Sequence, residues 1–115
     1  MPTYPFRLIT PDGKIFDEQI QSLVAPGLCG SFGVLANHTP MVASLAKGLL
    51  TLEKDQGIKY FAIGPGVLEV GLGSNVLLLS DYAYAADSKE AALEKGKTFE
   101  NKTFRNKPKR MAKSV

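Results

Sequence analysis

The sequence contains no tryptophan, one cysteine and one histidine among its 115 residues. With a single cysteine, Cys29, no disulfide can form within the chain, and a single histidine cannot build a zinc site from the usual ligands. No apolar run approaches the roughly 20 residues of a membrane-spanning helix. The residues after Met1 show neither the basic nor the apolar region of a secretory signal peptide. Together these absences indicate a reducing, cytoplasmic setting.

Basic charge is concentrated at one end of the chain. The formal net charge is +3, but residues 1–87 carry five Lys/Arg and eight Asp/Glu, whereas residues 88–115 carry nine and three. The body is therefore mildly acidic, and no nucleic-acid partner is expected. The basic segment from Lys102 to Lys113 offers only Phe104 for stacking, whereas single-strand binders use several aromatic residues. A solvated terminus is the preferred interpretation of this segment, and contact with an acidic protein surface or with anionic lipid is the second.

Short apolar runs separated by turn residues fill the chain from Phe6 to Ser80. Turn signals recur roughly every ten residues, which is the spacing of an antiparallel sandwich or barrel. The glycine-rich segment from Pro26 to Ser31 is expected to be an exposed loop, and the unbroken apolar run from Val76 to Ser80 is expected to be a buried strand. Strands are expected at residues 6–10, 14–18, 20–25, 41–45, 49–53, 58–63, 67–72 and 76–80.

One helix is expected after these strands. Asp87 offers an N-cap with Glu90 three positions later, a capping-box arrangement. The next residues favour helix, although Gly96 costs about 1 kcal/mol relative to alanine, and Pro108 ends any helix. The expected fold class is mostly β: an antiparallel β-sandwich or barrel of about eight to ten short strands, followed by one C-terminal helix and a basic tail. The expected division is residues 1–86 for the β-sandwich domain, 87–106 for the helix and 107–115 for a disordered basic tail.

Three features invite a chemical role that the sequence does not support. His38 lacks the positioned partner groups that catalysis or metal binding needs, so a loop or interface histidine is the preferred interpretation. Cys29 has no basic neighbour to activate its thiol, which favours an incidental residue over a redox site. Gly64-Pro65-Gly66 is followed by neither the lysine nor the helix of a phosphate loop, and it is interpreted as a strand break. We therefore expect no cofactor and no enzymatic activity of the chain itself.

Two ordered blocks of residues stand at a fixed spacing in the chain. The first block is Gly30-Ser31-Phe32-Gly33-Val34-Leu35, followed by His38-Thr39-Pro40 and then by Leu45 and Gly48. The second is Gly64-Pro65-Gly66-Val67-Leu68-Glu69-Val70 and then Asn75-Val76 to Asp81. Together they resemble the signature of the ATP synthase epsilon subunit family, from whose pattern Pro65 and Ser80 depart. The similarity covers about residues 3–93, and two blocks at matching spacing are far more specific than one glycine motif.

The resemblance implies a non-catalytic rotor subunit of a proton-translocating F-type ATP synthase, which clamps the gamma subunit to the c-ring at the foot of the central stalk. Its expected location is peripheral, on the cytoplasmic face of the inner membrane or the equivalent face of another energy-transducing membrane. Carried over by position, Gly30, Ser31 and Phe32 would face the c-ring, and His38, Thr39 and Pro40 would lie toward gamma.

Local chemistry adds detail to these expected contacts. Gly30 and Gly33 are expected to let the chain turn sharply and to present the residues between them on a stiff projecting loop. Many members of the family carry an acidic residue where Ser31 stands, so the ion pair of that residue with the ring is not expected here. Phe32 either anchors a partner or folds into the core, and the sequence leaves both open.

The C-terminal region is short for this family, whose full-length members end in two antiparallel helices that brake ATP hydrolysis or close on bound ATP. The family's ATP-sensing pattern falls on residues 86–91, where Asp87 and Ala91 match but Ala86 and Glu90 do not. The resemblance therefore implies a reduced inhibitory and ATP-sensing role, and it leaves open a contact of the tail with the catalytic alpha/beta hexamer. The alternative from another class is a free-standing β-sandwich that acts as an adaptor or binds a small ligand.

Overall fold

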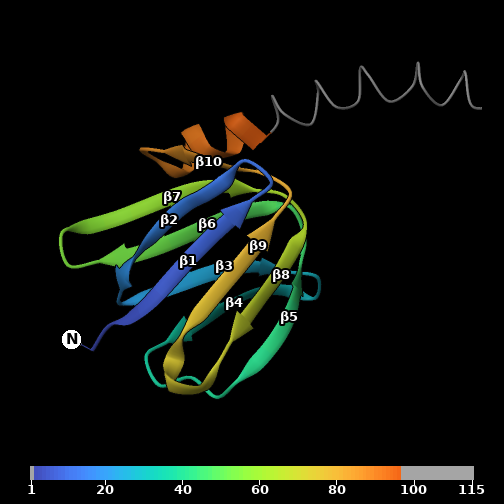
Figure 1. The fold of residues 1–115 in the computed structure, drawn as a ribbon. Helices are drawn as coiled ribbons and strands as arrows, with labels where there is room; N and C mark the ends of the chain where they lie inside the picture. The colour runs from blue at the N-terminus through green and yellow to red at the C-terminus, as the bar shows by residue number, and fades with distance from the viewer. Residues whose placement is uncertain (1, 97–115) are drawn as a thin grey trace, which may run out of the picture.

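The computed structural model describes residues 2–96, which form a mostly β fold with one helix at the end (Figure 1). Residues 89–96 are helical and are called the C-terminal helix here. The predicted helix beyond residue 96 and the predicted tail lie outside the described residues, so the division into three segments stays a prediction. The strands are β1 (Tyr4–Thr10), β2 (Gly13–Ile20), β3 (Ser22–Gly27), β4 (Gly30–Leu35), β5 (Met41–Leu45), β6 (Gly48–Lys54), β7 (Gly57–Ile63), β8 (Gly66–Val70), β9 (Val76–Ser80) and β10 (Ala83–Ala86), with a 3-10 turn η1 (Leu72–Ser74) between β8 and β9.

The ten strands form one hydrogen-bonded sheet that folds over into two layers (Figure 1). The strand order is β10-β7-β6-β3-β5-β8-β9-β1-β2, and β4 pairs with β3 off this path. One layer holds β2, β1, β9, β8 and β5, the other holds β4, β3, β6, β7 and β10, and they are joined where Gly27 pairs with Leu45. The expected mostly β class is confirmed. One pairing departs from the antiparallel expectation, because β1 runs parallel to β9.

Three hairpins of the sheet share one turn design, in which two residues are followed by a glycine. The glycines are Gly13, Gly30 and Gly57, with φ angles of 117°, 126° and 134°. Glycine adopts these positive φ angles without strain, because glycine has no Cβ that would clash with the backbone. Each glycine opens the second strand of its hairpin, and this places the β1–β2, β3–β4 and β6–β7 pairs in antiparallel register.

The segment expected to be a loop at residues 26–31 is the end of the β3–β4 hairpin. The two strands pair up to Gly27 and Gly30, so the turn between them is only two residues long. Gly33, expected to help the chain turn sharply, lies within β4 instead. The projecting element is therefore a β-hairpin, because the antiparallel ladder satisfies backbone groups that a loop would leave to water.

Alternate side chains of the strands point into the space between the two layers. Strand β1 buries Tyr4, Phe6, Leu8 and Thr10 and turns the residues between them outward. The buried strand expected at residues 76–80 is present as β9, but it is buried on one face only. Leu78 is fully buried, whereas Leu79 is 46 % exposed, because this layer is open to solvent on its outer side.

The C-terminal helix begins one residue later than the expected cap implies. The Ser88 Oγ accepts the backbone N–H of Ala91 at 3.1 Å, so Ser88 is the N-cap rather than Asp87. Ala92 is fully buried against the sheet. A Cβ on Gly96 would lie 3.7 Å from the Cβ of Ala62 in β7, in ordinary van der Waals contact. Two small residues on one helix face thus let the helix lie close to the sheet.

A buried hydrogen bond from Tyr4 connects the two layers. The Tyr4 side chain is 1 % exposed, and its hydroxyl donates to the backbone carbonyl of Val34 in β4 at 2.6 Å. Burial raises the pKa of the Tyr4 hydroxyl above its ordinary value, because the phenolate would lose its hydration. The group therefore stabilises the fold only while it is protonated.

Replacing Tyr4 by phenylalanine is expected to lower the free energy of unfolding by about 1–2 kcal/mol at neutral pH, because a buried hydrogen bond is lost. The same substitution should also make the free energy of unfolding depend less on pH above about 10. Since the folded pKa is raised, the unfolded chain loses its proton first, and stability falls as the pH rises above about 10. Urea unfolding from pH 7 to 11 measures both effects. The difference between the two proteins should be constant from pH 7 to 9 and shrink above it; parallel curves up to pH 11 would contradict the assignment.

Candidate functional site

The two groups of residues expected to contact partners lie at opposite ends of β4. Gly27 pairs with Leu45, so the hairpin end, with Gly30 beside it, lies at the C-terminal end of β5. Residues 36–40 connect the other end of β4 to the N-terminal end of β5. The structure therefore does not bring the two groups together, and any two partners they bind would meet different ends of this side of the sandwich.

The residues expected to face the c-ring form the first half of β4. Gly30 and Ser31 are exposed, and Ser31 pairs with Pro26 of β3. Phe32 is partly buried and packs against the core. Its ring also covers Gly27, where an added Cβ would lie 3.0 Å from the ring. Of the two roles left open for Phe32, packing on the core is the one observed, and Ser31 offers the more accessible side chain.

The residues expected to face gamma form the connection between β4 and β5. Thr39 and Pro40 are exposed and His38 is partly exposed. The His38 Nδ1 lies 2.7 Å from the carbonyl oxygen of Thr39, and because a carbonyl only accepts, this nitrogen carries the proton. The preceding residue, Asn37, is fixed by its backbone N–H, which donates to the Ser74 Oγ at 2.8 Å. The connection is thus tied to η1 by a hydrogen bond. It presents the His38 ring, whose orientation is fixed by its own hydrogen bond, together with the exposed Thr39 and Pro40.

A long stretch of the sequence without charge forms β3, β4 and β5. From Gln19 to Ala46 there is no Asp, Glu, Lys or Arg, although 22 % of the chain is charged. Three large apolar side chains within it are strongly exposed: Leu28 at 68 %, Leu35 at 66 % and Val42 at 68 %. Exposed large apolar groups are typical of protein contact surfaces. The sequence analysis does not predict these three exposed residues, although the absence of charged residues around them is visible in the sequence.

Ser80, which departs from the family pattern, fastens the strand break before β8. Its Oγ accepts the Gly64 backbone N–H at 3.0 Å and lies 2.7 Å from the carbonyl oxygen of Tyr82, to which it can donate. The Ser80 side chain is buried and holds the segment between β7 and β8 against the start of β10. This departure therefore has a structural role within the fold.

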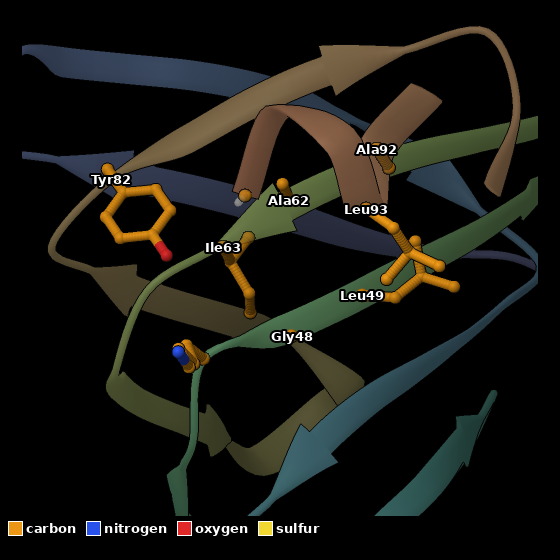
Figure 2. Close-up of a pocket in the computed structure, with 9 residues that line it drawn as sticks. Gly48, Leu49, Ala62, Ile63, Tyr82, Ala92 and Leu93 are labelled. Atoms are coloured by element: carbon orange, nitrogen blue, oxygen red, sulfur yellow. The ribbon is translucent and has the colours of Figure 1, made fainter. Parts of the chain in front are cut away.

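A small apolar cavity of about 160 Å³ lies between the C-terminal helix and the sheet (Figure 2). It is lined by Leu49, Ala62, Ile63, Tyr82, Ala92 and Leu93, among others. Cavities that bind drug-sized ligands are usually about 300–1,000 Å³. Within residues 2–96, no cluster of three or more His, Cys, Asp or Glu could hold a metal ion. Over the same residues, no helix is long and apolar enough to cross a membrane.

Comparison with known proteins identifies the fold and the family. Residues 3–86 match the family model of the ATP synthase delta/epsilon chain, beta-sandwich domain. The chain is 40% identical over 87 residues to the ATP synthase epsilon chain of Desulforamulus reducens and 33% identical over 88 residues to that of Campylobacter curvus. These matches cover 74% and 76% of this chain but 64% and 68% of the relatives, so the chain spans about two thirds of their length.

Solved structures of two ATP synthases contain similar chains. A chain of the Euglena gracilis mitochondrial ATP synthase, in a structure of OSCP, F1 and c-ring, superposes with a TM-score of 0.69 at 26% identity, covering 74% of this chain and 55% of that one. A chain of the Tetrahymena thermophila mitochondrial ATP synthase central stalk and c-ring gives 0.65 at 13% identity, over 72% of this chain and 66% of that one, and so supports the fold alone. Together with the family match, these similarities place the chain in the ATP synthase delta/epsilon family of non-catalytic subunits, through its beta-sandwich domain.

Proposed function

We propose that the protein is a rotor subunit of the central stalk of a proton-translocating F-type ATP synthase, where it clamps the gamma subunit to the c-ring. The observation that carries the proposal is the uncharged segment from Gln19 to Ala46, which forms β3, β4 and β5, exposes Leu28, Leu35 and Val42, and offers a contact surface at each end of β4. The related Euglena chain comes from a structure that includes F1 and the c-ring. In the cell the protein would lie at the F1 face of the energy-transducing membrane, which in bacteria is the cytoplasmic face of the inner membrane.

Each end of β4 is assigned one partner. Gly30, Ser31 and Phe32, beside the hairpin end, face the c-ring, and His38, Thr39 and Pro40, at the other end, face gamma. Ser31 is exposed and uncharged, so its contact with the ring depends on hydrogen bonding and packing rather than on an ion pair. Such a contact contributes mechanical coupling: torque passes from ring to gamma because both are held by one stiff β-sandwich.

Site-specific crosslinking tests both contacts in the assembled ATP synthase. The native Cys29 is exposed at the hairpin end, so a thiol-reactive photocrosslinker placed on it should capture a c subunit. In a Cys29→Ser background, the same reagent on His38→Cys should capture gamma. Asp17→Cys, exposed on β2 at the far edge of the other layer, serves as the matched control and should capture neither partner. Failure of both crosslinks in a complex that retains the chain would refute the assignment of these contacts.

Co-purification separates this proposal from a free-standing adaptor or a small-ligand-binding domain. The tagged chain should recover gamma and c-ring subunits in mild detergent. Recovery of neither would favour the alternative. What supports the rotor role is the uncharged segment from Gln19 to Ala46 with its three strongly exposed apolar side chains, because charged residues are depleted at the centre of protein contact surfaces.

We propose further that the inhibitory and ATP-sensing role of the family is reduced in this chain. Glu90, exposed on the first turn of the C-terminal helix, stands where the family pattern has arginine and would repel a triphosphate. Asp87, which matches the pattern, is exposed beside it. Residual inhibition would come from a contact of the basic C-terminal segment with the alpha/beta hexamer.

Isothermal titration of the full chain is expected to show no binding of MgATP at micromolar concentrations. The carboxylate of Glu90 is the physical reason, and Glu90→Gln serves as the control for charge alone. A dissociation constant in the micromolar range for the unmodified chain would overturn the proposed loss of sensing. The clamp role would be unaffected by that result, since it depends on the opposite part of the molecule.

A further inference from the structure

Strands that end a layer of the sandwich differ in how their open edges are protected. Strand β2 carries Lys14, Asp17 and Glu18, and Lys14 is paired with Asp17 at 2.8 Å. Strand β10 is only four residues long, and the Lys95 Nζ donates to its Ala85 carbonyl oxygen. Charged side chains and short length are the devices that keep sheet edges from pairing with other chains. Both of these edges are therefore blocked against an added strand.

The edge of β5 is partly covered by the hairpin. The Leu28 N–H donates to the Ser44 carbonyl oxygen at 3.2 Å, and the Ala46 N–H donates to the Pro26 carbonyl oxygen at 2.8 Å. These two bonds close the C-terminal half of β5 against the end of β3. Strand β4 has no comparable cover among the described residues, since its recorded strand partner is β3.

The open edge of β4 presents the backbone groups of three residues. In an antiparallel strand, both polar groups of one residue point to the same side, and successive residues alternate. The Pro26 carbonyl oxygen bonds to Ala46, away from β4, so its partner Ser31 also turns its N–H and C=O away from β3. By the same alternation, Gly33 and Leu35 point their backbone groups outward, while Phe32 and Val34 bond to β3.

The side chains of β4 add nothing that would hinder an approaching strand. The sequence Gly30–Leu35 contains no charged residue and no proline. Gly33 leaves room above its neighbour Val24, which is 44 % exposed, and Leu35 is 66 % exposed. Such an edge is a template for β-augmentation, in which backbone hydrogen bonds give affinity and alternate side chains give specificity.

The size of the edge decides between a second copy of the chain and another partner. Six residues of strand span about 20 Å, and one added strand of this length buries much less than the roughly 1,000 Å² of a stable interface. A β4–β4 dimer is therefore not expected to persist alone. A partner that other contacts already hold in an assembly can pair with the edge of β4. The entropic cost of association is then already met, so a short added strand is enough.

We infer that β4 binds an extended, uncharged segment of a neighbouring ATP synthase subunit as an added strand, through the backbone groups of Ser31, Gly33 and Leu35. The inference rests on the proposed rotor function and adds the mode of contact to it. An added strand would supply a directional connection that ionic strength does not weaken, since no charged side chain lies on β4.

Hydrogen exchange of the full chain, free and in the assembled ATP synthase, tests the inference. In the free chain, the amides of Ser31, Gly33 and Leu35 should exchange fast and those of Phe32 and Val34 slowly. In the complex, the three outward amides should become at least about tenfold more protected. Retention of the chain with unchanged exchange at these amides would overturn the added strand while leaving the rotor function intact. Protection of the same amides in the free chain, together with a dimeric mass, would overturn it in favour of a second copy.

A pair of variants at Gly33 gives an independent readout. Gly33→Pro removes the outward N–H without touching a bond to β3, and prolines are tolerated at such edge positions. Gly33→Ala keeps the N–H, and its Cβ would lie 3.5 Å from the Leu23 carbonyl oxygen, in ordinary contact. The proline variant should bind the rest of the complex about tenfold more weakly than the alanine variant. Equal binding of two variants with equal melting temperatures would overturn the inference, and failure of even the unmodified chain to assemble would refute the rotor function on which it rests.

Discussion

Replacing Gly66 by alanine is expected to destabilise the fold by about 3–5 kcal/mol, a loss comparable to the whole stability of many small domains. A Cβ built at Gly66 would lie 1.9 Å from the carbonyl oxygen of Leu79 and 2.9 Å from the Cα of Ser80. Both obstacles are backbone atoms of β9, so no side-chain rotation relieves them. The ladder between β8 and β9 would have to open at its Gly66–Ser80 end.

Urea unfolding followed by far-ultraviolet circular dichroism measures this effect, since the chain has no tryptophan to report by fluorescence. Gly33→Ala is the matched control, because the same added methyl group meets its nearest atom at 3.5 Å. It should leave the free energy of unfolding within about 1 kcal/mol of the unmodified protein. Equal stability of the two variants would show that β8 and β9 can separate at Gly66 without loss, contrary to the close approach seen here.

The fold class and most strands follow from local sequence patterns, and the misses have physical causes. Apolar runs bounded by turn residues predict β5, β6, β7 and β9 well, because the signal for each of these strands lies within its own few residues. The parallel pairing of β1 with β9 joins segments far apart in the chain, and no local pattern carries it. Strand β10, rich in alanine and next to a helix, has weak β propensity and forms because β7 offers it an edge.

The β3–β4 hairpin was predictable from a signal used elsewhere in the same sequence. Each of the turns before Gly13 and Gly57 contains an aspartate, Asp12 and Asp55, whereas Leu28-Cys29 before Gly30 has no turn-forming side chain. All three glycines adopt the same φ region. The position of glycine after the turn, rather than the polarity of the turn, was the informative feature.

The candidate site could be predicted only in part. A resemblance supplies the positions Gly30–Phe32 and His38–Pro40, but their roles stay predictions. The exposed residues Leu28, Leu35 and Val42 depend on which face of each strand is buried, and a one-residue change of register reverses that. The uncharged stretch from Gln19 to Ala46, in contrast, is visible in the sequence and marks the segment in which they lie.

Replacing Phe16 by alanine is the second change expected to cost about 3–5 kcal/mol. Phe16 on β2 is 6 % exposed. Its ring lies 6.0 Å from the ring of Phe6 on β1 and 5.9 Å, edge to face, from that of Phe61 on β7. Strands β2 and β7 belong to different layers, and no ladder joins the layers on this side. The aromatic cluster is thus a principal contact that closes the sandwich here.

Two variants separate the contribution of the Phe16 ring from that of the neighbouring ion pair. Phe16→Leu keeps an apolar side chain and should recover more than half of the loss, because most of the contact is burial rather than ring geometry. Glu18→Gln removes the exposed ion pair between Glu18 of β2 and Lys54 of β6, which crosses the same gap, and should cost no more than about 1 kcal/mol. If Glu18→Gln proved as damaging as Phe16→Ala in urea unfolding, charge pairing and not apolar packing would hold the layers together on this side. A sandwich closed by packing needs no ladder on this side, and the proposed rotor role would depend on that closure to keep the two layers together.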